Sequence, residues 1–418
     1  MRLAELTTLR VGGEAPRVLA PRTRDELVAT VLDVWAQDED FLLLGGGSNV
    51  LAGDDEFDGT VVLVRTEGID EVPAAAAHHA AHSARSTVRL RVEAGHSWDA
   101  LVAFTVENGL AGIEGLSGIP GSCGAAPIQN IGAYGQEVGE VLASIEFLDF
   151  ETGELVHIPA AELGLGYRTS VLKQGRQGLV VSIDLDLTVD APAAESATAT
   201  ASAALSAPRS APIAYPQLAS ALGVELGDRV TLADVRETVL ALRASKGMVL
   251  DPADPDSVSA GSFFTNPIVS ESFAAGLPAE APRWPIAQEA EPEAVVRVLE
   301  RDGQIDEPGF ASDLAAARNA GANAAASTSP SGSSSGAPDV RLVKLSAAWL
   351  IEHAGIRRGF RLPGSRAAVS SKHTLALTNT GGATAADVTE LARYIQTRVL
   401  SEFGVRMQAE PVLVGTQL

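Results

Sequence analysis

The stretch that most constrains the fold of this chain runs from Gly118 to Gly139 and reads GIPGSCGAAPIQNIGAYGQEVG. It contains six glycines and two prolines in 22 residues, with one charged residue, Glu137. A loop that only connects two elements is usually polar and exposed, whereas this stretch carries three isoleucines, which favour burial. We therefore expect another part of the chain, or a ligand, to cover it.

Length and charge limit the classes of function. At 418 residues the chain is long enough for two or three domains. A formal net charge of −22 argues against a nucleic-acid partner, because that affinity depends on clustered Lys and Arg. No apolar run reaches the roughly 18 residues that span a bilayer, and the first residues lack the apolar core of a signal peptide. We expect a cytoplasmic protein without a membrane partner.

The single cysteine, Cys123, excludes an internal disulfide and any metal site built from several cysteines. It is compatible with a reducing compartment. A catalytic thiol would need an adjacent base, and none is evident beside Cys123, so we expect a buried packing residue there and no metal site.

The periodicity of the chain predicts an α+β architecture. Helices are expected at residues 23–36, 97–108, 231–247, 346–355 and 384–403, and strands at 41–44, 60–65, 88–95, 178–189, 373–379 and 405–415, with a hairpin turning at 151–154. Strict alternation between 178 and 189 places Val181, Ile183 and Leu185 on one face, which predicts a half-buried antiparallel sheet. Three biased segments, 71–87, 190–211 and about 270–339, are interpreted as inserts or linkers, the last largely disordered.

A second glycine block, Gly45–Gly46–Gly47 followed by Ser48 and Asn49, suits a phosphate because glycine lets backbone N–H groups converge on an anion. Alone it is a weak signal, and a tight turn is the plain alternative. The Rossmann fingerprint requires a helix after the glycines, whereas here a strand follows. Together with the stretch at 118–139, the block favours a dinucleotide between two subdomains.

Six segments in this order resemble signatures of the UDP-N-acetylenolpyruvoylglucosamine reductase family. They are TTLRVGG at 7–13, LLGGGSNVL at 43–51, GLAGIEGLSGIPGSCGAAPIQNIGAYGQEV at 109–138, GYRTSVLK at 166–173, AGSFFTNP at 260–267 and VSSKHTLALTN at 369–379. The resemblance covers nearly the whole chain apart from the predicted inserts. It implies a vanillyl-alcohol-oxidase (PCMH-type) FAD-binding domain of two α+β subdomains, at 1–66 and 67–190, and a linker at 191–211. It also implies a substrate-binding α+β domain at 212–406 and a C-terminal strand at 407–418. The protein is expected to be a monomer.

The resemblance also implies an oxidoreductase with non-covalent FAD and NADPH as hydride donor. Its substrate would be UDP-N-acetylglucosamine enolpyruvate and its product UDP-N-acetylmuramate, in the peptidoglycan synthesis that supports cell-wall biogenesis, cell shape, the cell cycle and cell division. Hydride addition to the enolpyruvyl methylene places negative charge on the neighbouring carbon and its carboxylate. Such a site needs a fixed cation, a proton donor and an orienting group.

The family's catalytic positions fall on Arg168, Ser262 and Glu410. Ser262 would supply the proton, and Arg168 with Glu410 would stabilise the enolate. Without the motifs, an Arg after Tyr is more often solvated or stacked, and a Ser after Gly is more often a turn residue. Glu410 stands in an otherwise apolar segment, where a carboxylate is costly unless it is paired or functional.

The motifs also assign binding residues. The FAD-binding positions would be Gly45, Gly46, Gly47, Ser48, Asn49, Ser117, Gly118, Ile119, Pro120, Gly121, Ser122, Gly124, Ala125, Gln129, Asn130, Gly132, Ala133 and Tyr134. The sugar nucleotide would be held by Tyr167, Tyr215, Lys246 and Asn266. Two alternatives are a flavin oxidase acting on another alcohol and a non-catalytic nucleotide-binding module. The distal motifs oppose the first, and the presence of all three catalytic positions opposes the second.

Overall fold

A computed structural model of the chain describes residues 1–37, 39–73, 86–189, 208–286 and 341–418. These residues form two compact units, one made of Met1–Pro267 with Ser346–Leu418 and the other of Ile268–Leu345. Every residue of the predicted site belongs to the larger unit. The architecture is mixed α and β, as the periodicity predicts.

The largest sheet of this unit is antiparallel, in the order β11-β10-β12-β6-β5, with the short β7 on β12. Its strands are β5 (Ile69–Val72), β6 (Ser86–Glu93), β7 (Leu110–Ala111), β10 (Leu142–Asp149), β11 (Leu155–Pro159) and β12 (Gly178–Val189). The β10–β11 pair confirms the predicted hairpin. Helix α2 (Trp98–Glu107) begins at its Ser97 cap and contributes Leu101 and Val102 to the same core as this sheet.

The prediction that β12 is half-buried is wrong on two counts. Residues 179–185 are buried on both faces, because the polar side chains there are paired inside; Asp184, for example, lies 2.8 Å from Arg91. In addition, the β10–β12 register shifts between Glu146 and Phe147, which leaves an extra residue, Val181, in β12. A bulge reverses the alternation, so Val181 packs with helix α1 whereas Ile183 packs with the α2 core.

The N-terminal region forms a small parallel sheet, β1-β4-β2, from β1 (Arg17–Leu19), β2 (Asp40–Leu44) and β4 (Gly59–Leu63). Helix α1 (Arg24–Trp35) packs against it through Leu27 and Val31 and begins with the predicted Thr23–Glu26 capping box. Strand β3 (Val50–Ala52), which was not predicted, pairs in parallel with the C-terminal β19 (Val412–Val414). The C-terminal strand therefore shares a ladder with the segment that follows the second glycine block.

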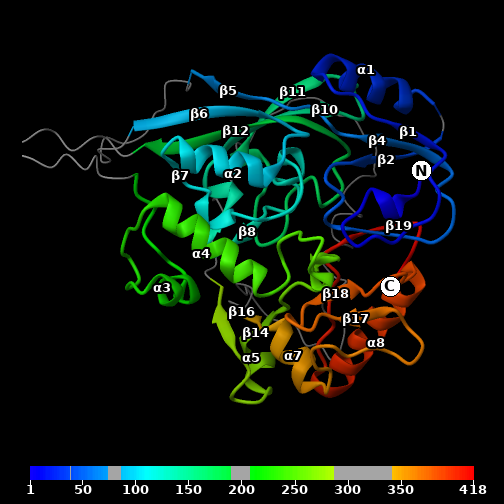
Figure 1. The fold of residues 1–418 in the computed structure, drawn as a ribbon, viewed down its shortest axis with the longest axis vertical. Coiled ribbons are helices and arrows are strands. Elements are labelled where there is room, and N and C mark those ends of the chain that lie inside the picture. The colour runs from blue at the N-terminus through cyan, green and yellow to red at the C-terminus, as the bar shows by residue number, and fades with distance from the viewer. Residues whose placement is uncertain (38, 74–85, 190–207, 287–340) are drawn as a thin grey trace, which may run out of the picture. The chain divides into compact units, whose positions relative to one another are not determined.

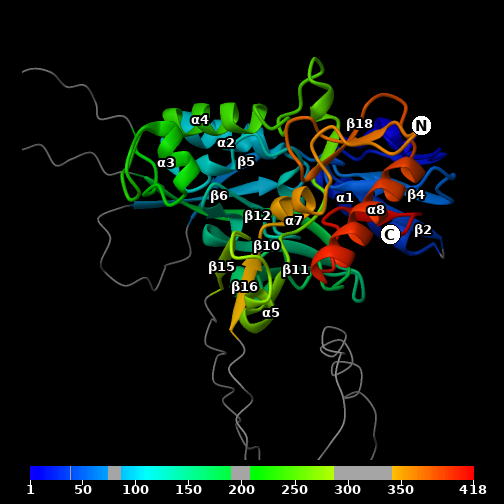
Figure 2. The same ribbon diagram turned by 90° about the horizontal axis from the view of Figure 1, so that it is seen from below.

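Helices α3 (Pro216–Leu222) and α4 (Leu232–Ala244) pack on each other through Leu218 and Val239. Helices α2 and α4 lie side by side (Figures 1 and 2). Arg236 of α4 donates to both oxygens of Asp99 of α2, at 2.7 and 3.0 Å. This bidentate pair joins the N-terminal half of α4 to α2, and Gly118 N donates to the same carboxylate.

The C-terminal part of the larger unit contains the sheet β13-β18-β17, from β13 (Ser259–Ser262), β17 (Ala367–Val369) and β18 (Ala376–Asn379). Helix α8 (Ala385–Phe403) packs on β17 and β18, and helix α7 (Ala347–His353) packs on α8. The predicted Thr384 cap of α8 is confirmed, and Asp54 accepts hydrogen bonds from Ala385 N and Ala386 N at the same end.

The smaller unit corrects the prediction for the start of the third insert. Residues 268–286 are ordered as β14 (Ile268–Ser270), helix α5 (Glu271–Ala275) and β15 (Arg283–Pro285), and with β16 (Leu342–Leu345) they form the sheet β14-β16-β15. The strands of this sheet are short, and each contributes only a few buried apolar side chains, such as Val343 and Leu345 of β16. Such short segments show no hydrophobic periodicity in the sequence. The ends of the other two predicted inserts are corrected as well, because residues 71–72 belong to β5, residues 86–87 belong to β6, and Arg209 bridges to Thr231. The remaining predicted insert residues, 74–85, 190–207 and 287–339, lie outside the described residues.

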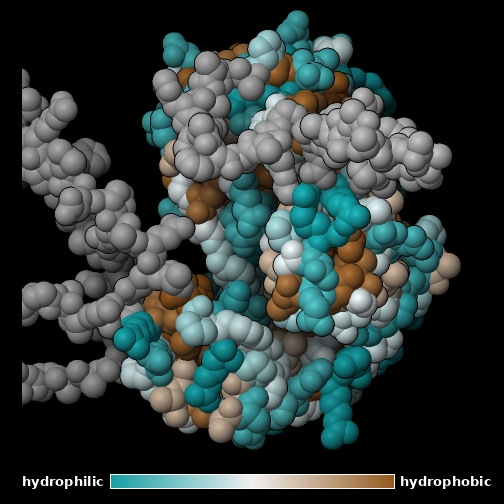
Figure 3. Space-filling model, turned by 90° about the vertical axis from the view of Figure 1, so that its left-hand side faces the viewer, coloured by the Kyte–Doolittle hydropathy of each residue, from teal (hydrophilic) through white to brown (hydrophobic). Residues whose placement is uncertain are grey.

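Within the described ranges, no helix is long and apolar enough to cross a membrane. On the face shown in Figure 3, hydrophobic residues gather in small patches separated by hydrophilic ones. This face therefore offers no broad apolar surface in its coloured part.

Candidate functional site

A cavity of about 300 Å³ lies where separate segments of the larger unit converge. Its lining comprises Leu43–Val50, Trp98, ten residues between Ile119 and Gly132, Arg168, Lys173, Arg243, Met248, Ala260, Gly261, Ser262, Glu410 and Val412. All three predicted catalytic residues line it, together with both glycine-rich blocks. The structure thus brings together positions that are up to 369 residues apart in the sequence, from Leu43 to Val412.

The two glycine blocks touch each other at one wall of this cavity. A Cβ atom at Gly45 would lie 2.3 Å from Ser122 Oγ, and one at Gly46 would lie 2.7 Å from Gly121 Cα. Glycine is therefore required for the two loops to approach, and Ser48 Oγ donates to Pro120 O at 2.9 Å across the junction. The backbone N–H groups of residues 46–49 find no acceptor within the described part of the chain. Consecutive free N–H groups on a glycine turn form a cradle for an anion.

The predicted FAD-binding residues divide into two sets. Those that line the cavity are Gly45, Gly46, Gly47, Ser48, Asn49, Ile119, Pro120, Gly121, Ser122, Ala125, Gln129 and Gly132. Ser117, Gly118, Gly124, Asn130, Ala133 and Tyr134 are not among the lining residues. Several of the second set support the loops: Ser117 Oγ donates to Glu114 O at 2.7 Å, and buried Asn130 donates to Glu137 and Gly166 O.

Arg168 lies in a tight turn closed by the bridge between Gly166 and Thr169, with φ at +55°. Its guanidinium donates to Asn130 O at 3.2 Å and to Gly132 O at 2.6 Å, so the glycine-rich stretch holds it in place. Its Nε lies 3.3 Å from Glu410 Oε1. The cation is thereby fixed at the cavity wall by two carbonyls and one carboxylate.

Ser262 ends β13 immediately after a β-bulge. Ser259 pairs with Thr378 and Ser262 pairs with Ala376, so β13 contains one residue more than β18 over this interval. Gly261 accommodates the bulge with φ at +72°. The bulge changes the direction of Ser262, which lines the cavity. Its hydroxyl has no hydrogen-bond partner among the described residues.

Glu410 reaches the cavity because its segment pairs with the one after Ser262. Glu410 N donates to Phe263 O at 2.9 Å, next to the antiparallel bridge between Phe264 and Ala409. Asn49 Nδ2 donates to Glu410 O at 3.3 Å on the other side. Burial raises the pKa of the Glu410 carboxyl above its ordinary value, and the positive charges of Arg168 and Lys173 oppose this shift only in part.

The predicted sugar-nucleotide residues lie outside the lining of this cavity. Tyr215 and Lys246 meet at Tyr134: the Tyr134 and Tyr215 rings are 5.7 Å apart, edge to face, and Lys246 Nζ lies 5.5 Å from the Tyr134 ring centre. Asn266 Oδ1 accepts from Ala347 N at 2.9 Å at the start of α7. Burial raises the pKa of the Tyr167 phenol, and Arg168 and Asn266 oppose this shift only in part.

Two cations in the lining, Lys173 and Arg243, were missed from the sequence. Lys173 ends the motif GYRTSVLK, so its closeness in sequence to Arg168 could have identified it as a residue of the site. Arg243 follows Val235 and Val239 at helical spacing on the buried face of α4, where a charged residue is out of place. Cys123 is buried in the core, which confirms the predicted packing role, and burial raises the pKa of its thiol.

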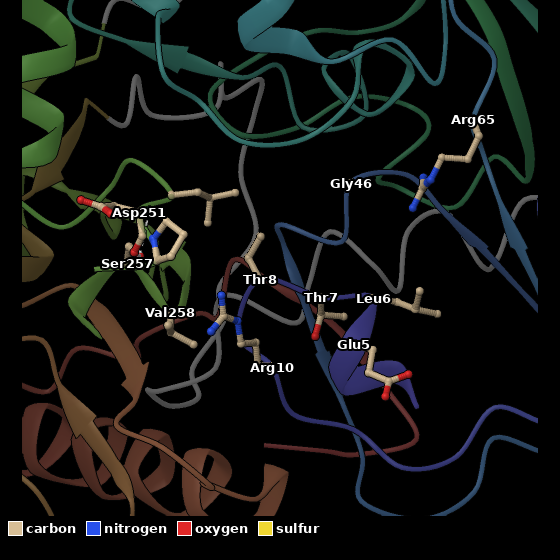
Figure 4. A pocket seen from close by; sticks show the side chains of 12 residues that line it. Glu5, Leu6, Thr7, Thr8, Arg10, Gly46, Arg65, Asp251, Ser257 and Val258 are labelled. Atoms are coloured by element: carbon tan, nitrogen blue, oxygen red, sulfur yellow. Dashed lines mark hydrogen bonds between the residues drawn. The ribbon is translucent and has the colours of Figure 1, made fainter. Parts of the chain in front are cut away.

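A second cavity of about 370 Å³ shares only Gly46 with the first (Figure 4). Arg65 lies on one side of it and Asp251 and Ser257 on the other, with Arg10 beside Val258 (Figure 4). Arg65 is already engaged, because its Nη1 donates to Gly45 O at 3.0 Å and Val64 O at 2.9 Å. This arginine therefore supports the glycine turn from behind.

Comparisons with known proteins show the family of the chain. The profile of the FAD binding domain matches residues 15–159, and that of the C-terminal domain of UDP-N-acetylenolpyruvoylglucosamine reductase matches residues 252–414. Curated UDP-N-acetylenolpyruvoylglucosamine reductases are 54% identical in Leifsonia xyli and 44% identical in Nocardia farcinica, over 100% of this chain and 98% and 90% of theirs. The crystal structure of the Thermus caldophilus enzyme of this name covers 99% of this chain and 97% of its own, with a TM-score of 0.53 at 22% identity, a likeness of fold.

Proposed function

This chain belongs to the UDP-N-acetylenolpyruvoylglucosamine reductase family, and we propose that it reduces UDP-N-acetylglucosamine enolpyruvate to UDP-N-acetylmuramate. The cofactor is FAD, and NADPH is the proposed hydride donor. The observation that carries the proposal is the convergence of Arg168, Ser262 and Glu410 on one cavity that also contains an anion cradle. A cytoplasmic location is part of the proposal, supported by the single buried, unpaired cysteine.

The residues present fit FAD. The free N–H groups of residues 46–49 suit a pyrophosphate, and the walls formed by Ile119, Ile128 and Ile131 suit a flat ring system. Bound there, FAD would accept a hydride from NADPH and deliver it to the substrate's methylene carbon. The remaining chemistry falls to side chains of this chain.

Three side chains would handle the charge and the proton. Arg168 supplies a positive charge, already fixed by two carbonyls, for the substrate carboxylate and the enolate. Ser262 has an uncommitted hydroxyl that would donate its proton to the enolate carbon. Glu410 orients the guanidinium of Arg168, and its raised pKa means that the carboxyl holds a proton more readily than an ordinary glutamate.

The sugar nucleotide would extend from the cavity towards the Tyr134–Tyr215–Lys246 cluster. Lys246 offers a charge for its pyrophosphate, and the half-exposed Tyr215 ring offers a surface for the sugar or base. Asn266 and Tyr167 would contribute from the turn before α7. These assignments rest on the motifs. They also rest on the closeness of Lys246 to Arg243 of the cavity lining, whose positive charge lowers the pKa of Lys246 in addition to burial.

The direct test is to mix purified protein, FAD, NADPH and UDP-N-acetylglucosamine enolpyruvate and to detect UDP-N-acetylmuramate by mass spectrometry. Release of a flavin spectrum on denaturation is expected as well. A flavin-loaded protein that is reduced by NADPH but is not reoxidised by this substrate would contradict the proposed reaction.

Ser262→Ala tests the assigned proton donor. Reduction of the bound flavin by NADPH should remain within about twofold, whereas reoxidation by the substrate should slow by about 10²-fold or more, since only that step consumes the proton. Stopped-flow absorbance separates the two half-reactions. Ser245→Ala, at the exposed end of α4, is the control and should change neither step. Equal losses in both half-reactions would remove Ser262 from this role.

A further inference from the structure

The N-terminal loop at residues 6–10 touches two parts of the larger unit that contribute to the site. On one side, Thr8 N donates to Gly47 O at 3.0 Å, so the loop contacts the anion cradle. On the other side, Thr8 Oγ1 donates to Ser259 O at 2.7 Å, at the first residue of β13. The same strand ends at Ser262, the proposed proton donor. One residue therefore bridges the cradle and the strand that carries the proton donor.

The hydroxyl of Thr8 is committed to β13. A hydroxyl has a single hydrogen to donate. Two carbonyls lie near Thr8 Oγ1, Ser259 O at 2.7 Å and Ser48 O at 3.5 Å, and only the shorter separation is normal for an O–H···O bond. Since β13 is an edge strand of the sheet β13-β18-β17, this bond ties the edge of the sheet to the N-terminal loop.

Ser259 passes this constraint on to the bulge of β13. Its own hydroxyl accepts from Gly261 N at 3.2 Å. Gly261 has the positive φ of the bulge and directly precedes Ser262. A bulge disrupts the ladder locally, so bonds to the neighbouring strand fix its residues less completely. The position of Ser262 therefore depends on the bonds that Ser259 makes.

The loop at residues 6–10 is itself held in place. Buried Asn379 of β18 donates from Nδ2 to Arg10 O at 3.0 Å. Arg10 has a φ of +55°, a conformation that persists in a residue with a side chain only where the surrounding structure imposes it. A Cβ atom at Gly47 would lie 2.0 Å from Leu6 O, so the glycine turn packs directly on the loop. The loop is therefore a fixed spacer between the cradle and β13.

We propose that Thr8 is a positioning residue whose hydroxyl holds β13 at the distance from the cofactor cradle at which Ser262 can deliver its proton. This inference rests on the proposed function. Hydride from the flavin and the proton from Ser262 must reach neighbouring carbons of one substrate. A misplacement of about 1 Å can cost about 10²-fold in rate. Thr8 acts here through backbone carbonyls of this chain and needs no contact with the substrate.

The test compares FAD-loaded wild-type protein with Thr8→Val and Thr8→Ser in stopped-flow experiments. In Thr8→Val, reduction of the flavin by NADPH should stay within about twofold, whereas reoxidation by UDP-N-acetylglucosamine enolpyruvate should slow at least about tenfold, because only the second step depends on Ser262. Thr8→Ser keeps the donor and should restore most of the rate. Thr7→Val is the matched control, since Thr7 Oγ1 donates to Val11 O at 3.4 Å within the same stretch, and it should change neither step.

Hydrogen exchange tests the same link without substrate. The Gly261 N–H group should exchange at least about tenfold faster in FAD-loaded Thr8→Val than in wild type, because its acceptor residue, Ser259, has lost an anchor. Thr7→Val should exchange like wild type. Mass spectrometry of peptides that cover β13 gives the rates.

Unchanged reoxidation and exchange in Thr8→Val would overturn the proposal, as would equal losses in the two half-reactions or the same slowing in Thr7→Val. If Thr8→Val does not fold, Ser259→Ala decides. It removes the hydroxyl that accepts from Gly261 N and should slow reoxidation selectively, and a normal rate would overturn the proposal. A wild-type protein that binds FAD but is not reoxidised by the substrate would count against the proposed function instead, and the exchange rates would still decide this inference.

Discussion

At the scale of single residues, Glu410 illustrates why a functional carboxylate is costly. Burial raises its pKa, so the folded chain binds this proton more tightly than the unfolded chain does. The resulting cost to stability is present above the folded-state pKa and disappears as the pH falls below the unfolded value of 4.5. The partial compensation by Arg168 and Lys173 keeps the charged form accessible.

Glu410→Gln should therefore raise the melting temperature at neutral pH while lowering turnover about 10²-fold. The stability gain should shrink as the pH approaches 4.5, because the wild-type carboxyl is then protonated in both states. Calorimetry at several pH values, together with steady-state assays, checks both parts. A variant less stable than wild type at neutral pH would show that the ion pair with Arg168 outweighs desolvation.

His373 affects the pH dependence of stability in the direction opposite to Glu410. Burial, aided by Lys246 and Arg358, lowers the pKa of its imidazole from 6.5 to about 4. The unfolded chain binds this proton more readily, so stability should be lost as the pH falls from 6.5 through 4, by roughly 3 kcal/mol in all. His373→Gln should remove most of this pH dependence in urea titrations. The exposed His157→Gln control should not, and a wild-type slope in His373→Gln would contradict the assignment.

At the scale of elements, the β13 bulge shows how backbone geometry positions a functional group. Gly261 adopts φ +72°, and nothing lies within 4 Å of the position of its missing Cβ, so the conformation alone demands glycine. An alternating strand without the bulge would direct Ser262 to the other side of the sheet.

Gly261→Ala should reduce stability by about 1 kcal/mol through backbone strain and should slow the second half-reaction by misplacing Ser262. Gly364→Ala is the matched control, because Gly364 has a similar φ of +81° and equally open surroundings away from the cavity. The control should show the same stability loss with normal activity. If both variants keep full activity, the bulge does not position the hydroxyl.

At the scale of the molecule, one wall of the cavity forms where the C-terminal strand meets the segment after the second glycine block. β19 pairs with β3, and Val412 N donates to Asn49 O at 2.9 Å, directly beside the anion cradle. The same segment carries Glu410 past Phe263. The C-terminal strand thus joins the cofactor cradle to the proposed proton donor.

Val412→Pro should break this junction, since proline has no N–H to donate. We expect a stability loss of about 1–3 kcal/mol and weaker FAD binding, measured by denaturation and by flavin fluorescence titration. Val412→Thr, at a position 53% exposed, keeps the N–H and should behave like wild type. Undiminished FAD affinity in the proline variant would show that the cradle does not depend on the C-terminal strand.

Much of the local structure could be predicted from the sequence, because it depends on neighbours in the chain. The Thr23 and Thr384 caps, the β10–β11 hairpin and the burial of Cys123 each follow from side chains a few residues apart. The family motifs likewise pointed to Arg168, Ser262 and Glu410, which the fold does bring to one cavity.

Only the tertiary structure decided the features that depend on distant segments. The bulge at Val181 changes which core the following side chains of β12 enter, because β10 pairs out of step there. Segment β3 is a strand because β19, about 360 residues further on, supplies its partner. Arg243 has the spacing of a core residue, and only the fold shows that its guanidinium reaches the cavity with a donor unused. The sequence by itself determined capping, turns and motif chemistry, since these are local interactions. Strand register, the burial of charged groups and the pairing of β3 with β19 depend on packing between distant segments, which no local sequence pattern indicates.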